Sequence, residues 1–393
     1  GKRWEADSRL FCLETCMADL TFRISPNIVL GSYTTGRLGQ FALSWGTKYM
    51  LICDPVLKEV GTTEKITTAL TDRGIDFFIF DTLSETAETK VVDQALTLAR
   101  KAHIQGVIAA GGGKTLHVAR AVCALYNETK DLYDFLEKTP VTAAPLPLIC
   151  IPTTGRDSFM FSDTVPLIDS RSSRISLIKA QSGLCKLALF DPNLTVTLSE
   201  KQIGSMTQEV FCLTIEAYLS QKANFFSDMI AEKAIELLGY ALDENRSTAS
   251  TTPQNELLAQ SGCMASLAAA TSSIGPASLL ALSINARTKI SRALITSILL
   301  PHVLEDSIKF KADRIAKLMS IMRHDSEGKS QEELAASCID LARQRLAKLN
   351  LPARLKDLAI SMEQLTAAAE DAGFNIRGCD IRDPENYDHM EEM

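Results

Sequence analysis

The sequence predicts a two-domain protein: an α/β, Rossmann-like domain that binds a dinucleotide, followed by an all-helical domain. The first observation is length, because 393 residues are enough for two domains of about 100–200 residues each. The second is an alternation of short apolar runs and helical patterns up to residue 150. The third is a change near residue 195, after which strand patterns stop. We therefore expect domains at 1–195 and 196–393.

Strands and helices alternate in the first domain. Buried strands are expected at 48–53 (KYMLIC), 76–80 (DFFIF), 106–110 (GVIAA) and 148–151. Helices are expected at 65–73 and 90–101, where apolar residues recur every three or four positions. This alternation predicts a mostly parallel sheet with helices on both faces.

The second domain shows helical patterns only. Ser199 to Gln202 has the form of a capping box and should open the first helix. Further helices are expected at 200–220, 225–244, 253–273, 290–307, 310–322, 330–348 and 361–372. The acidic segment 380–393 should form a loose end.

Composition excludes several classes of function. The apolar share of 46% and charged share of 23% are ordinary for a soluble enzyme. A net charge of -7 gives no reason to expect nucleic acid or an anionic membrane as a partner. No apolar run reaches the length of a membrane span. The N-terminal segment lacks the apolar stretch of a signal peptide, so we expect none.

The ten cysteines are scattered, and several stand in apolar surroundings. We interpret them as small core residues in a reducing compartment, which predicts a cytoplasmic protein. Cys12 and Cys16 form a lone C-x3-C pair without a second half, so we do not expect zinc there.

A glycine-rich turn is the main functional signal. The strand pattern GVIAA runs directly into Gly111, Gly112 and Gly113, and a helical pattern follows. Glycines let the backbone approach a pyrophosphate, and the helix N-terminus offers free N–H groups and a positive dipole end. The alternative is a plain tight turn without a ligand.

Asp54 stands at the end of the strand at 48–53. A carboxylate there can accept hydrogen bonds from both ribose hydroxyls of NAD and would repel the additional phosphate of NADP. Alternatively, Asp54 caps a helix or a turn.

Five segments resemble the iron-containing (group III) alcohol dehydrogenases, in the order of that family. GGGKTLHVAR resembles its GGGSxxDxAK signature, and ICIPTTGRDS resembles its IPTTAGTGSE loop. The other three segments are FDPNLTVTLSEKQ, QEVFCLTIEAYLS and ILLPHVLE. The resemblance covers nearly the whole chain. It implies an N-terminal dinucleotide-binding domain and a helical C-terminal domain of the dehydroquinate synthase-like kind, with the active site between them.

The resemblance also implies positions for the cofactor, NAD. Residues 111–113 and Lys114 would meet the pyrophosphate, Thr153 and Thr154 would lie by the cofactor, and Asp54 by the ribose. Two departures stand out. His117 replaces the signature Asp, and the loop at 152–157 is one residue short and carries Arg156 and Asp157. We expect a small-molecule substrate and a homodimer.

The metal ligands of the family are missing. Its members hold iron or zinc with one Asp and three His of the helical domain. The matching positions here are Glu209, Leu213, Ser278 and Arg292. The chain has five histidines, and none lies between residues 118 and 301. We therefore predict that the protein binds neither iron nor zinc.

Three functional interpretations remain. The first is a metal-free nicotinamide-dependent oxidoreductase, acting on a small aldehyde or alcohol, in which Arg292, Lys289 or Ser278 polarises a carbonyl. Arg292 also suggests an anionic substrate, unless it is a solvent-facing residue. The second is a non-catalytic relative that binds a nucleotide or a partner. The third is an ordinary iron enzyme with a different register, which the histidine count argues against.

Overall fold

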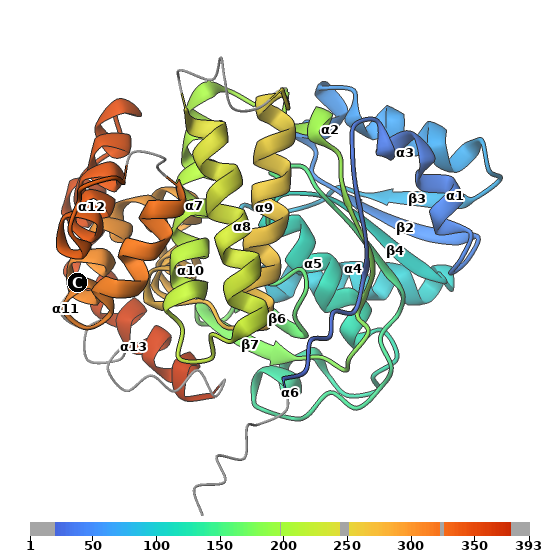
Figure 1. Ribbon diagram of the computed structural model, residues 1–393. Coiled ribbons are helices and arrows are strands. Elements are labelled where there is room, and N and C mark those ends of the chain that lie inside the picture. The colour runs from blue at the N-terminus through green and yellow to red at the C-terminus, as the bar shows by residue number, and fades with distance from the viewer. Residues whose placement is uncertain (1–19, 197, 244–250, 323–325, 379–393) are drawn as a thin grey trace, which may run out of the picture.

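The computed structural model describes residues 20–196, 198–243, 251–322 and 326–378. Cys12, Cys16 and the acidic segment 380–393 lie outside these residues. A sheet covered by helices forms one half of the molecule, and a group of helices forms the other (Figure 1). The last strand of the sheet ends at Phe190, and the first helix of the helical half begins at Glu200.

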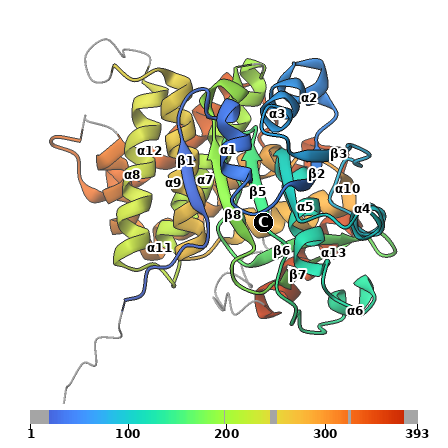
Figure 2. The ribbon, with the colours of Figure 1, turned by 90° about the vertical axis from the view of Figure 1, so that its right-hand side faces the viewer.

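The sheet has six parallel strands in the order β1-β8-β5-β4-β2-β3. The four expected strands are confirmed, whereas β1 and β8 were missed. Figure 2 shows β1 and β8 on the side of the sheet next to α8 and α9. The strands are β1 (Asn27–Leu30), β2 (Lys48–Cys53), β3 (Asp76–Phe80), β4 (Gly106–Gly111), β5 (Leu148–Pro152) and β8 (Cys185–Phe190).

The sheet is buried on both faces, because alternate side chains of a strand point to opposite faces. Met50 and Ile52 of β2 enter one core with α4 and α5, while Tyr49 and Leu51 enter another with α1 and α3. The expected helices on both faces are thereby confirmed. The helices of this half are α1 (Leu38–Ala42), α2 (Val56–Glu59), α3 (Thr62–Thr71), α4 (Thr89–Ala102), α5 (Gly113–Leu125) and α6 (Leu132–Leu136).

An antiparallel hairpin, β6 (Thr164–Asp169) and β7 (Arg174–Lys179), stands apart from the main sheet and was not expected. The loop before it is fixed by Arg120 of α5. The fully buried guanidinium of Arg120 donates hydrogen bonds to the carbonyls of Met160, Ser162 and Thr164 at 2.5–3.1 Å. This anchoring holds the segment between β5 and β6 against α5.

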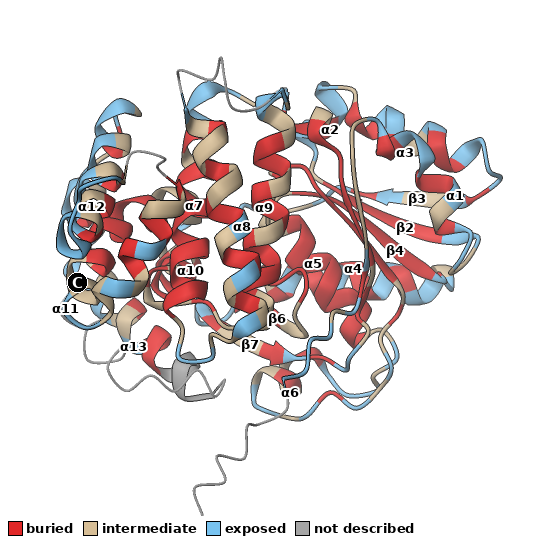
Figure 3. Ribbon diagram, viewed as in Figure 1, coloured by how far each residue is buried: buried red, intermediate tan, exposed pale blue. Residues whose placement is uncertain are grey.

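The helical half centres on α7, which is buried along most of its length (Figure 3). The capping box at Ser199 is confirmed, since its hydroxyl accepts from the N–H of Gln202 at 3.2 Å. The helices are α7 (Glu200–Leu219), α8 (Phe225–Leu242), α9 (Gln254–Thr271), α10 (Pro276–Thr288), α11 (Arg292–Met322), α12 (Gln331–Lys348) and α13 (Met362–Gly378).

One helix of this half, α10, was not expected. The two helices expected at 290–307 and 310–322 are present as the two parts of α11, which are separated by a kink at Lys311 (φ -132°, ψ 31°). Among the described residues no single helix has the length and apolar composition of a membrane span. Only α9 and α10 together pass that test, and they meet at 97°.

Candidate active site

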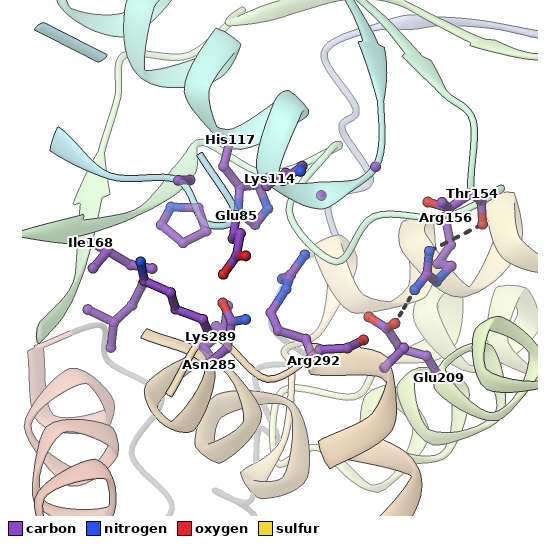
Figure 4. Close-up of a pocket in the computed structure, with 18 residues that line it drawn as sticks. Glu85, Lys114, His117, Thr154, Arg156, Ile168, Glu209, Asn285, Lys289 and Arg292 are labelled. Carbon is purple, nitrogen blue, oxygen red and sulfur yellow. Dashed lines mark hydrogen bonds and ion pairs between the residues drawn. The ribbon is translucent and has the colours of Figure 1, made fainter. Parts of the chain in front are cut away.

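A cavity of about 310 Å³ lies between the two halves of the molecule (Figure 4). Its wall combines the turn between β4 and α5, the loop after β5, the β6–β7 hairpin and the segment that joins α10 to α11. The charged and polar side chains in this wall are Glu85, Lys114, His117, Thr154, Arg156, Glu209, Asn285, Lys289, Ser291 and Arg292.

The glycine turn has the expected strand–turn–helix form. β4 ends at Gly111, Gly112 precedes the helix, and α5 begins at Gly113. Gly111 has a φ of 157°, and a Cβ there would collide with the side chain of Thr115. Gly112 makes no side-chain cap, so the first N–H groups of α5 are left for a ligand.

Asp54 and Lys114 lie next to each other at the carboxyl edge of the sheet. The N–H of Asp54 donates to the carbonyl of Ala110 at 3.0 Å, and its Oδ2 lies 3.9 Å from Lys114 Nζ. Asp54 Oδ1 also accepts from the N–H of Val56 at 3.2 Å, as a turn-capping residue would. The structure thus brings together the residues expected at the ribose and at the pyrophosphate.

The two threonines differ in their access to the cavity. Thr153 is buried, and its N–H donates to the carbonyl of Gly111 at 3.0 Å. Thr154 lines the cavity, and its buried Oγ1 has no hydrogen-bond partner among the described residues. A buried hydroxyl without a partner costs free energy, which favours a ligand at Thr154.

An ion pair occupies the first of the positions that the resemblance assigns to metal ligands. Glu209 of α7 pairs with the guanidinium of Arg156, which also donates to the carbonyl of Thr154 at 3.2 Å. Both side chains are only 11% exposed. The cation beside this carboxylate is therefore supplied by the chain itself.

The other metal positions do not offer ligands. Leu213 is buried among apolar side chains. Ser278 does not line the cavity, because its hydroxyl donates to Glu216 at 2.5 Å. The described part of the chain contains no group of three His, Cys, Asp or Glu residues that could hold a metal ion. The residues present do not fit the metal of the resembled family.

Glu216 was missed by the sequence analysis. Its buried carboxylate also accepts from the N–H groups of Ala277 and Ser278, at 2.8 and 3.0 Å, and so caps α10. Burial raises its pKa, although these hydrogen bonds oppose the shift. The catalytic role expected for Ser278 stays a prediction, and its contact with Glu216 makes it a weaker candidate than Arg292.

Arg292 and Lys289 bring positive charge to the cavity. Lys289 follows α10 in a left-handed conformation (φ 62°), and Arg292 is the first residue of α11. Within the described chain neither side chain forms a hydrogen bond or ion pair. The Arg292 guanidinium lies against Gly113, where a Cβ would displace it.

A buried His–Asp pair lies beside Arg292. His117 Nε2 and Asp157 Oδ2 are 3.2 Å apart, and both side chains are almost fully buried. Burial lowers the pKa of His117, and Asp157 only partly opposes the shift. Burial disfavours ionisation of Asp157, but His117 and Arg292 outweigh it and hold the pKa of Asp157 below its ordinary range.

The class of protein follows from this geometry. A glycine turn at the carboxyl edge of a parallel sheet, facing a helical domain across a cavity, defines a two-domain protein of the dinucleotide-binding type. Residues 25–192 match the family profile described as "Iron-containing alcohol dehydrogenase", and residues 205–391 match that of its C-terminal domain. The chain belongs to the iron-containing alcohol dehydrogenase family.

Known relatives agree with this assignment. "Probable alcohol dehydrogenase EutG" of Escherichia coli is 26% identical over 90% of this chain and 88% of its own. The 1,3-propanediol dehydrogenase of Citrobacter freundii is 22% identical over 83% and 84%. A solved 1,3-propanediol oxidoreductase has a TM-score of 0.84 at 20% identity, covering 95% of this chain and 98% of its own. These relatives indicate an alcohol or aldehyde oxidoreductase.

Proposed function

We propose that the protein is an NAD-dependent oxidoreductase that acts on a small aldehyde or alcohol without a bound metal. The ion pair between Arg156 and Glu209 carries this proposal, because it neutralises the one carboxylate left at the family's metal positions. Arg292 adds a second fixed cation at another of these positions. A metal ion would meet two guanidinium groups and too few ligands.

The residues of the glycine turn fit the cofactor. We infer that the N–H groups at the start of α5 and the ammonium of Lys114 hold the pyrophosphate, with the unpartnered Thr154 hydroxyl as a further donor. Asp54 would accept from the ribose hydroxyls, which favours NAD over NADP. When bound, the nicotinamide cofactor supplies or accepts the hydride.

Arg292 and Lys289 fit the substrate. A guanidinium can polarise a carbonyl oxygen or hold an anionic group, and neither side chain forms an ion pair with a described residue. We therefore infer a small, anionic carbonyl compound as substrate. Reduction of the carbonyl needs only its polarisation and a proton, whereas oxidation must stabilise an alkoxide without a metal.

A structural relative, the sulfoacetaldehyde reductase of Bifidobacterium kashiwanohense in complex with NAD+, has a TM-score of 0.76 at 17% identity, covering 90% of this chain and 92% of its own.

The second candidate is a non-catalytic nucleotide- or partner-binding protein. The position of Arg292 favours it, because the guanidinium lies against Gly113, at the helix start where a phosphate would approach. The same contact serves catalysis if Arg292 turns to the ligand when the cofactor binds.

The test combines binding with turnover. Calorimetry with NADH and NADPH should show tighter binding of NADH. Reduction should then be assayed with butanal and with 4-oxobutanoate, which share a four-carbon aldehyde skeleton and differ in the terminal carboxylate. We expect turnover with a preference for 4-oxobutanoate. Binding of NADH without turnover of any carbonyl compound, tested over a broad panel, would instead support the non-catalytic candidate.

We further propose a homodimer in the cytoplasm. The seven described cysteines are all free and buried, as expected in a reducing compartment. Light scattering after size exclusion measures the oligomeric state.

A further inference from the structure

We propose that His117 is the proton donor and acceptor of this active site, and that Asp157 is its positioning residue. The inference rests on the proposed function. The proposed reaction requires such a group. Without a metal, a side chain must take the hydroxyl proton of an alcohol or deliver a proton to a carbonyl oxygen.

His117 occupies a suitable place. It lines the cavity together with Lys114 and Arg292, one turn into α5 from the glycine turn. Arg292 and Asp157 both approach Gly113, so the three side chains surround one point of the cavity wall. A carbonyl oxygen held by Arg292 would therefore lie beside His117.

Asp157 is held rigidly by its surroundings. Its N–H donates to Ser266 Oγ of α9 at 3.1 Å, and its Oδ1 accepts from the N–H of Phe159 at 2.9 Å. Arg120 fixes the loop that follows. Only Oδ2 remains for the imidazole of His117, at 3.2 Å.

This contact determines which nitrogen can react. With the carboxylate of Asp157 ionised, Nε2 of His117 carries the hydrogen and donates it, and Nδ1 of the neutral ring is the basic nitrogen. Asp157 stabilises the imidazolium that forms when Nδ1 accepts a proton. The arrangement resembles the histidine and aspartate of a hydrolase triad with the roles of the two ring nitrogens exchanged.

His117 can take part in the reaction in both directions. In oxidation the alcohol O–H bond breaks and its proton moves to His117 Nδ1. The electron pair of the adjacent C–H bond leaves with its hydrogen, as hydride, to the oxidised cofactor, and the C=O bond forms. In reduction the carbonyl carbon receives hydride from the reduced cofactor, and the carbonyl oxygen takes the proton from the imidazolium.

The charged groups around His117 set the pH dependence. Asp157 faces it from the loop after β5, Arg292 from α11 and Arg120 from its own helix. Lys114 and Glu85 line the same cavity. Burial and the two arginines lower the pKa of His117, so the ring is neutral at rest. Reduction should slow as the pH rises above this pKa, because the imidazolium becomes scarce, and oxidation should slow below it.

The experiment compares His117→Gln and Asp157→Asn with wild type, and His103→Gln serves as a control at a distant histidine. For His117→Gln we expect kcat of reduction to fall about 10²–10⁴-fold and its pH dependence to disappear. For Asp157→Asn we expect a smaller fall and a profile displaced to lower pH, because the imidazolium loses its anion. His103→Gln should behave as wild type, and NADH affinity should change little in all three.

Unchanged kcat and pH profile in His117→Gln would overturn the proposal while leaving the proposed function intact. Absence of carbonyl turnover by the wild type would overturn both. If His117→Gln does not fold, the pH profile of Asp157→Asn decides: an undisplaced profile contradicts the proposal, and a displaced one supports it.

Discussion

The two walls of the cavity differ in how much of the family pattern they keep. The glycine-turn wall keeps the strand–turn–helix geometry, with Asp54 and Lys114 at the sheet edge. In the helical wall, Glu209 pairs with Arg156, and Arg292 stands at a position that the resemblance assigns to a metal ligand, so we propose that this wall works without a metal. If the proposal holds, the difference teaches that a fold can preserve a cofactor site while the groups that activate the substrate are replaced.

Arg292→Ala should give the largest effect on the helical wall. Removing one oxyanion-stabilising donor typically lowers kcat about 10²–10³-fold, and we expect such a loss in aldehyde reduction. NADH affinity should change far less, because the glycine-turn wall binds the cofactor and the helical wall acts on the substrate. Arg292→Lys should recover part of the activity because it restores the positive charge. Lys289→Ala is the control, because it removes a neighbouring cation of the same charge. Steady-state kinetics with equal turnover in Arg292→Ala and wild type would remove Arg292 from the mechanism.

The ion pair between Arg156 and Glu209 should matter for stability. Removing one partner of a buried pair leaves an uncompensated charge and costs about 3–5 kcal/mol of unfolding free energy. We expect such a loss in Glu209→Ala. The double variant Arg156→Met, Glu209→Met should regain most of it, because no lone charge remains. Urea unfolding measures both, and a single variant as stable as wild type would contradict the interior role of the pair.

Substitutions of Asp54 test whether the glycine-turn wall determines the cofactor preference. Asp54→Gly should narrow the preference for NADH over NADPH by about tenfold, equivalent to about 1.4 kcal/mol, because the repelling carboxylate is gone. Asp54→Asn can still accept from the N–H of Val56 but lacks the charge, so it separates charge from turn geometry. Calorimetry of wild type and both variants with each cofactor measures the six affinities. Tighter NADPH than NADH binding by the wild type would refute the role given to Asp54.

Metal treatment should have the smallest effect. The purified protein should contain far less than one iron or zinc per chain, and incubation with chelator or with zinc should leave turnover unchanged. Elemental analysis and parallel assays measure this. One tightly bound metal per chain, with activity lost on its removal, would mean that the helical wall has kept the family chemistry after all.

The sequence predicted the sheet better than the elements around it. The strand at 106–110 and its glycine turn followed from apolar patterning and from residues that tolerate close backbone approach. α10 was missed because it is buried on nearly all sides, so it has no polar face and no amphipathic period. β6 contains Pro166 and lies outside the main sheet, paired with β7, and proline argues against a strand.

For the candidate site, the sequence predicted which positions line it but not which side chains contact one another. Glu209 and Arg292 were located by resemblance, but their partners were not. Arg156 and Glu209 lie 53 residues apart, and His117 and Asp157 lie 40 apart. No periodicity relates such pairs, because contacts across the cavity depend on how helices and loops pack. The sequence held one signal for the contact between His117 and Asp157, because both residues depart from the family pattern.

The contact between Arg292 and Gly113 bears on how this lineage can be recognised. The resemblance implies that the third glycine meets a phosphate, and here a side chain at 113 would also displace the Arg292 guanidinium. Natural selection could therefore retain Gly113 even in a descendant that no longer binds a dinucleotide. The three glycines alone then do not show whether such a descendant still binds a dinucleotide. In related genomes, the joint presence of Gly113 and Arg292 would identify the sequences to which the proposed metal-free site extends.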